Sequence, residues 1–179
     1  TLIAAMVYAP WVGYLLLTGG VSWTWAGAGF VLLSAVIHLG YSLFLQRGYQ
    51  VADLSVVYPV ARGTGPMLSS LAAFLLLGES PTAAGLLGLV LVVAGILMIA
   101  TQGRLATFST PGGHAGLRWG TATGGLIASY TVVDAYAVKA LGVAPVVLDW
   151  FTNILRLSML LPLILSRPRR AIGAMHGYW

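Results

Sequence analysis

Three charged residues lie inside long apolar runs of the sequence: Arg62, Asp134 and Arg156. If these runs cross a bilayer, each charge costs about 2.5–3.5 kcal/mol near the helix centre, so it usually faces a bundle interior or a water-filled cavity. A permanently charged arginine attracts anionic groups such as carboxylates, whereas an aspartate can exchange protons or serve as a counter-ion. The three residues therefore predict a binding cavity, a set of structural ion pairs, or both.

Arg62 stands in the stretch YPVARGTGP, residues 58–66, near the middle of its apolar run. Pro59 and Pro66 each remove a backbone donor, and the glycines beside Arg62 let a helix bend. Helical spacing gives this run one polar face, made of Ser55, Tyr58, Arg62, Pro66 and Ser69. Discontinuous helices beside a midplane charge recur in transporter binding sites. We expect Arg62 to line a cavity, or alternatively to pair with Asp134 and lock the bundle.

The second apolar run offers a further polar face with Ser34, His38 and Tyr41. An imidazole exchanges protons near neutral pH, so His38 is either a proton gate or a hydrogen-bonded packing residue. Asp134 follows Tyr130 by one helical turn and is either a proton-coupling carboxylate or a counter-ion for an arginine. Arg156 either pairs within the bundle or contacts a substrate. The candidate substrate-binding residues are Arg62, Tyr58, His38, Tyr41, Asp134 and Arg156.

Other kinds of site find no support in the residue patterns. The chain contains no HExxH, GxSxG or P-loop motif, and it has four acidic residues and no cysteine. Its three histidines are scattered, so we predict no metal site, no cofactor and no enzymatic activity. The net charge of +5 comes from basic residues that punctuate apolar runs, which argues against nucleic-acid binding.

The elements that must position these residues are helices in a membrane. Of 179 residues, 59% are hydrophobic and 7% are charged, too few for the polar shell of a soluble domain. Apolar runs of near-spanning length predict an all-α transmembrane bundle with a lipid bilayer as its partner. The expected spans are residues 2–17, 25–45, 52–78, 82–101, 119–141 and 145–165. Small residues at four-residue spacing predict close helix packing, namely Gly120, Gly124 and Ala128, and Ala84 with Gly88.

The run ADLSVVYPVARGTGPMLSSLAAFLLLGESPTAAGLLGLVLVVAGILMIA resembles the EamA-like branch of the drug/metabolite transporter superfamily. In that family a proline-containing fourth helix ends in a Gly-Glu pair, here Gly78 and Glu79, and a short glycine-spaced helix follows. The resemblance implies ten helices in two inverted five-helix repeats, of which this chain would hold about six. Residues 1–101 would then be helices two to five of the first repeat, 102–118 the inter-repeat loop, and 119–179 the start of the second repeat. On this reading we expect the chain to be truncated at both ends.

The resemblance also implies a function and a location. We expect a multi-pass secondary transporter of the bacterial inner membrane that exports small metabolites, amino acids or drugs by alternating access. Its substrate would be anionic or zwitterionic, and a homodimer is one expected assembly. The alternative is a non-transporting membrane scaffold or accessory subunit that packs through small-residue helix faces. Orientation stays open, because the arginine-rich loops favour one side as cytoplasmic and the resemblance favours the other.

Overall fold

The computed structural model describes residues 2–19, 24–76, 78, 80–101 and 103–166. Within these residues the chain is helical, with one short 3-10 helix and no strand. The α-helices are α1 (Leu2–Leu17), α2 (Trp25–Val51), α3 (Leu54–Leu76), α4 (Ala83–Thr101), α5 (Pro111–Lys139) and α6 (Pro145–Ser166), and η1 (Leu105–Ser109) is the 3-10 helix. The predicted all-α membrane bundle is confirmed as a fold class.

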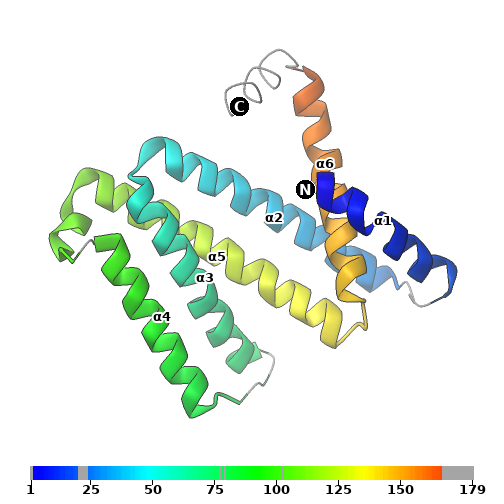
Figure 1. Cartoon of the computed structure of the whole chain (residues 1–179), viewed down its shortest axis with the longest axis horizontal. Helices are drawn as coiled ribbons and strands as arrows, with labels where there is room; N and C mark the ends of the chain where they lie inside the picture. The colour runs from blue at the N-terminus through cyan, green and yellow to red at the C-terminus, as the bar shows by residue number, and fades with distance from the viewer. Residues whose placement is uncertain (1, 20–23, 77, 79, 102, 167–179) are drawn as a thin grey trace.

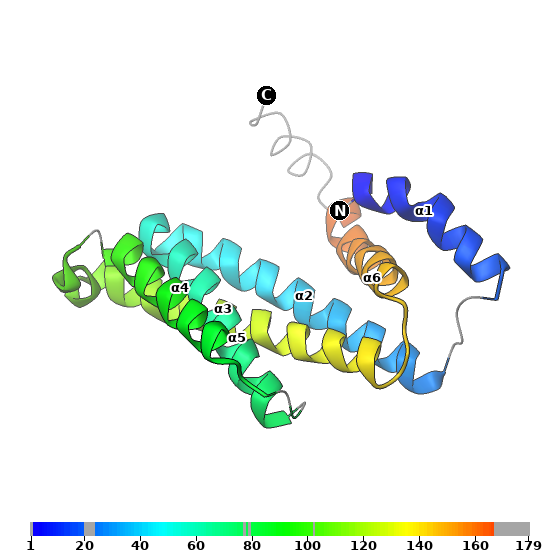
Figure 2. The ribbon, with the colours of Figure 1, turned by 60° about the horizontal axis from the view of Figure 1, so that its bottom comes forward.

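Helix α5 is the centre of the bundle. It runs beside α2 through the middle of the molecule, with α3 and α4 towards one end and α6 with α1 at the other (Figure 1). Figure 2 shows that α1 and α6 rise away from the elongated group formed by the other four helices. The indole N–H of Trp150 in α6 donates to the backbone carbonyl of Ala5 at 2.8 Å and so ties α1 to α6.

A row of glycines on α5 brings it against α3. The positions of Gly116, Gly120 and Gly124 meet Val56, Val60 and Thr64 in turn, so the two helices run parallel in a fixed register. A Cβ atom at Gly120 would lie 2.8 Å from the Cβ of Val60, closer than real contacts allow. The predicted close packing at Gly120 and Gly124 is therefore confirmed. Gly88 on α4, by contrast, has no neighbouring atom within 4 Å and makes no such contact in this chain.

Two segments expected to be loops are helical. Residues 46–50 belong to α2, where Gly48 packs tightly on Val57 and Trp119. Residues 111–118 belong to α5, because Thr110 caps the helix by accepting the Gly113 N–H at 3.0 Å and Pro111 fits the first turn. The prolines and glycines that suggested a loop here are the start signal of a helix.

The prolines of α3 do not break it. The helix continues from Leu54 to Leu76 through Pro59 and Pro66, so the expected discontinuity is absent. The Ser69 hydroxyl donates to the carbonyl of Pro66 at 3.1 Å, and the Thr64 hydroxyl donates to that of Val60 at 2.8 Å. Both hydroxyls bond back to carbonyls of the preceding turn, as serine and threonine commonly do within helices.

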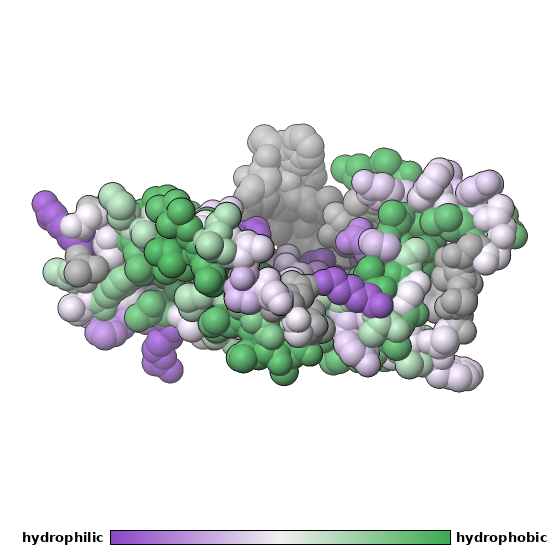
Figure 3. Space-filling model, turned by 90° about the horizontal axis from the view of Figure 1, so that it is seen from below, coloured by the Kyte–Doolittle hydropathy of each residue, from purple (hydrophilic) through white to green (hydrophobic). Residues whose placement is uncertain are grey.

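The outer surface suits a lipid environment. Among the described residues, α2 and α4 are long and apolar enough to cross a membrane, and Ala5–Leu17 is a shorter apolar helix. Large apolar side chains of α4, including Leu87, Val90 and Met98, are exposed. One face of the molecule is largely hydrophobic, with hydrophilic residues gathered near its middle and one end (Figure 3). The core, in contrast, consists mainly of valine and alanine, as expected where helices associate by close packing.

The α3–α5 contact predicts opposite results for two neighbouring glycine substitutions. Gly120→Ala forces a methyl group into Val60 and should destabilise the fold by about 1–3 kcal/mol. Gly125→Ala, whose position has no atom within 4 Å, should be neutral or slightly stabilising, because alanine favours a helix. Thermal unfolding of the purified protein in detergent compares the two. Equal midpoints for both variants would contradict the packing role of Gly120.

Candidate functional site

An aromatic stack joins α2 to α5. The rings of His38 and Tyr130 stack with centroids 3.7 Å apart. Tyr41, one turn after His38, lies 5.7 Å from the His38 ring and 5.4 Å from that of Tyr130. This contact follows from the antiparallel course of the two helices, which also sets Gly48 beside Trp119. The stack forms a rigid wall with both apolar faces and polar edges.

A carboxylate lies at one side of this stack. The Nδ1 atom of His38 is 3.2 Å from the hydroxyl of Ser34 and 3.0 Å from its carbonyl oxygen. The Ser34 side chain also interacts with the carboxylate of Asp134. The second carboxylate oxygen, Oδ1, is buried and has no hydrogen-bond partner. Ser34 thus links His38 to Asp134 and leaves one oxygen of the aspartate available.

A guanidinium lies on α6, beside the same stack. The Nη2 atom of Arg156 donates to the hydroxyl of Ser42 at 3.1 Å, and its Cζ lies 6.0 Å from the centre of the Tyr41 ring. Ser42 in turn donates to the carbonyl of His38 at 2.9 Å. The Nε atom of Arg156 is buried without a partner, as is the hydroxyl of Thr152 one turn earlier. Arg156 is therefore held at one nitrogen and unsatisfied at another.

These residues form one cluster at the junction of α2, α5 and α6, which we call the polar junction. It consists of Ser34, His38, Tyr41, Ser42, Tyr130, Asp134, Thr152 and Arg156. Beside it an apolar core seals the same three helices around Val31, Ala137 and Leu148. Three of its polar atoms, on Asp134, Thr152 and Arg156, are buried without a hydrogen-bond partner, whereas buried polar atoms normally have one. No group of three possible metal ligands occurs among the residues that the structure describes.

The structure places Arg62 and Tyr58 elsewhere. Both side chains are exposed on α3, and the Arg62 guanidinium lies 5.5 Å from the centre of the Tyr58 ring. Among the described residues no contact joins Arg62 to Asp134, whose Oδ1 atom has no hydrogen-bond partner. The alternative in which Arg62 pairs with Asp134 is therefore not what the structure shows. Four of the six candidate residues meet at the polar junction, and these two lie outside it.

Four members of the polar junction are absent from the six candidate residues. Ser34 enters the sequence analysis only as part of the polar face of its helix. Tyr130 enters the sequence analysis only as the residue one turn before Asp134. Thr152 could have been found, since it stands one turn before Arg156 on the same helix face. Ser42 carries no sequence signal, because its bond to Arg156 spans 114 positions of the chain.

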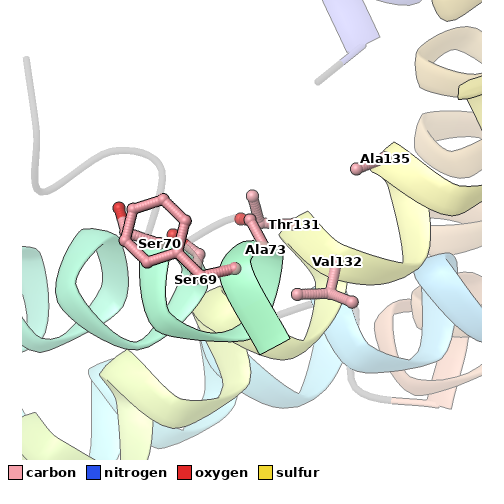
Figure 4. Close-up of a pocket in the computed structure, with 7 residues that line it drawn as sticks. Ser69, Ser70, Ala73, Thr131, Val132 and Ala135 are labelled. Carbon is pink, nitrogen blue, oxygen red and sulfur yellow. The ribbon is translucent and has the colours of Figure 1, made fainter. Parts of the chain in front are cut away.

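A separate pocket opens between α3 and α5. Its volume is about 240 Å³, and its lining includes the hydroxyl-bearing residues Ser69, Ser70 and Thr131 (Figure 4). It lies beyond the close contact of Gly65 with Ile127, on a different face of α5 from Asp134. None of the described residues that line it is charged, so these residues offer hydrogen bonds without charge recognition.

No family model matches the chain, and no solved structure matches it. The multidrug resistance protein EbrB of Bacillus subtilis (strain 168) is 36% identical over 87 residues, which cover 48% of this chain and 69% of that protein. EbrB of Bacillus atrophaeus is 34% identical over 87 residues, with the same coverage of 48% and 69%.

Both relatives are multidrug resistance proteins, so they support the resemblance to a multidrug transporter that the sequence shows. They do not support the EamA-like branch specifically. Their identity to this chain extends over more than two thirds of their own length. The chain therefore belongs to the small multidrug resistance family.

Proposed function

We propose that the chain acts as a membrane exporter of small molecules, drugs among them, and that the polar junction binds the substrate. The observation that carries this proposal is the set of three buried, unmatched polar atoms contributed by α5 and α6 beside the aromatic stack. The multidrug resistance proteins to which the chain is similar support the same role. The proposal involves no enzymatic step.

Alternating access requires the walls of such a site to move relative to each other. The polar junction lies where α6, with α1 attached, meets α2 and α5 (Figure 2). The bond between Arg156 and Ser42 and the apolar core around Val31 and Leu148 connect the two sides. Rocking of α1 and α6 against α2 and α5 would open one route to the site and close another. Because the sequence has no ATP-binding motif, we propose that an ion gradient or the substrate's own gradient drives transport.

The wider assembly is part of the same proposal. We place the chain as a multi-pass protein of the bacterial inner membrane, with about six of ten helices of an EamA-like arrangement in two repeats. Each α-helix of the structure overlaps one of the six expected membrane spans. The boundary between the two repeats at residues 102–118 rests on the resemblance alone. Residues Arg167, Arg169 and Arg170, which contribute to the orientation argument, lie outside the described residues, as does Glu79 of the Gly-Glu pair.

A scaffold or accessory role is a second candidate, favoured by the surface of α4. This helix is exposed along most of its length, and Gly88 and Gly95 present open positions with no atom within 4 Å. Small residues of this kind allow close approach of another helix, from a partner or a second copy. Purified protein that forms stable oligomers but moves no substrate in vesicles would favour this candidate over export.

Substitution of Arg156 should disable transport. Arg156→Gln removes the guanidinium from Ser42 and from the binding site, and we expect transport into proteoliposomes to fall at least about tenfold. Arg47→Gln, at an exposed arginine that contacts Gln50, is the matched control and should transport normally. Unchanged transport in Arg156→Gln, with normal protein levels, would remove the polar junction from the mechanism.

Arg62 provides a separate test of the site that the sequence indicated. We expect Arg62→Ala in the complete protein to abolish transport while membrane insertion is retained, because a guanidinium attracts the anionic group of a substrate. Drug resistance of an expressing bacterial strain and the amount of protein in its membrane fraction are the two measurements. Wild-type resistance in this variant would show that Arg62 has no part in transport.

A further inference from the structure

A groove outside the polar junction lies between α2 and the first turns of α5. Its volume is about 500 Å³, and its lining is Phe44 of α2 with Ala115, Arg118, Trp119 and Ala122 of α5. The four residues of α5 share one helix face, and the two alanines leave space beside it. The rings of Phe44 and Trp119 meet edge to face with centroids 5.4 Å apart. The groove therefore combines aromatic surface with one charged group.

The guanidinium of Arg118 is accessible to a ligand. The side chain is exposed, and no hydrogen bond or ion pair holds it among the residues that the structure describes. A guanidinium presents its N–H donors in a planar fork that matches two oxygens of a phosphate. A small inorganic anion would use the arginine alone, whereas a ligand with a phosphate and a hydrocarbon chain uses the arginine and the aromatic groove together.

The groove lies at the level where α5 enters the membrane. The apolar run expected to span it, residues 119–141, begins directly after Arg118. Helix α5 has 29 residues and is about 43 Å long, more than the about 30 Å of a hydrocarbon core, so its ends extend into the headgroup regions. Tryptophan and arginine are both frequent at this interface. A phospholipid can therefore meet Arg118 with its phosphate while an acyl chain follows the groove past Ala122.

The charge at this end of the bundle favours an anionic lipid. The end of α2 lies beside the start of α5, because Gly48 packs on Trp119. The start of α3 and the 3-10 helix η1 pack on the same part of α5. Three cationic side chains face one carboxylate among the described residues of these segments: Arg47, Arg104, Arg118 and Asp53. Basic pockets between helices at a membrane interface attract anionic headgroups.

We propose that this groove is a binding site for an anionic phospholipid. The lipid phosphate pairs with Arg118, and one acyl chain packs on Phe44, Trp119 and Ala122. A zwitterionic lipid binds less tightly, because its headgroup has no net charge to interact with the basic end of the bundle. The site is separate from the polar junction, so this inference goes beyond the proposed function and does not depend on it.

Quenching of tryptophan fluorescence by brominated lipids tests this site. The full chain is reconstituted in phosphatidylcholine vesicles with increasing fractions of phosphatidylglycerol or phosphatidylcholine that carries bromine on its acyl chains. The emission of Trp119 is obtained as the difference between the wild-type chain and Trp119→Phe, which keeps a ring in the groove. We expect phosphatidylglycerol to quench this emission with an affinity about fivefold higher than that of phosphatidylcholine.

Substitution of Arg118 should remove this preference. In Arg118→Gln the phosphate loses its guanidinium, and we expect both lipids to quench alike, whereas Arg118→Lys keeps the charge and most of the preference. Arg47→Gln is the matched control, because it removes the same charge from the same end of the bundle but outside the groove lining. It should retain the preference. Since Arg118 is exposed, the thermal unfolding midpoints of all these variants should match that of the wild-type chain.

Four results would overturn the lipid site. They are equal affinities of the two lipids for the wild-type chain, an unchanged preference in Arg118→Gln, displacement of the brominated lipid by soluble glycerol phosphate, and no quenching of Trp119 by either lipid. The last result would mean that a second copy or another part of the protein covers the groove. Export measured in the same vesicles keeps the two proposals apart, because loss of the lipid preference with continued export supports this site and leaves the polar junction as the transport site.

Discussion

The close contact between α5 and α3 sets the geometry on which the rest of the bundle depends. Without side chains at Gly116, Gly120 and Gly124, the two backbones approach closely, and the register of α5 becomes fixed. The C-terminal half of α5 then places Tyr130 against His38 of α2, and Asp134 against Ser34 of the same helix. In a membrane no hydrophobic force drives helices together, so packing of this kind has to do so. The polar junction is a consequence of that packing.

The polar junction also shows how a membrane protein keeps charges among apolar helices. Most of its groups are satisfied locally, by a serine one turn away or across a helix interface, as Ser34 and Ser42 illustrate. Three atoms remain unmatched on α5 and α6. A purely structural cluster gains stability by satisfying every member, whereas a binding site keeps some of its capacity for the ligand. The location of the cluster between two groups of helices is consistent with a site that opens by relative motion.

Much of the fold follows from the sequence because bilayer thickness and hydropathy act along the chain. The six apolar runs predicted the helices, and four of six candidate residues meet in one cluster. The errors have a local cause. Gly48 and the Pro111–Gly113 segment look like loop residues, yet one is a packing contact and the other a capped helix start. Pro59 and Pro66 suggested a broken helix, whereas the proline-bearing α3 remains continuous.

Residue type and local spacing are enough to specify the class of protein, the helix positions and the cost of each charge within an apolar run. Which charges lie together depends on how the helices pack. Arg62 was the leading candidate because proline and glycine surround it, but it lies on an exposed face of α3 with Tyr58. Arg156 has no proline or glycine beside it in the sequence, and it enters the cluster through Ser42 and Tyr41 of a distant helix. Helix register and crossing are set by packing between surfaces far apart in the chain, so no local pattern specifies these pairs.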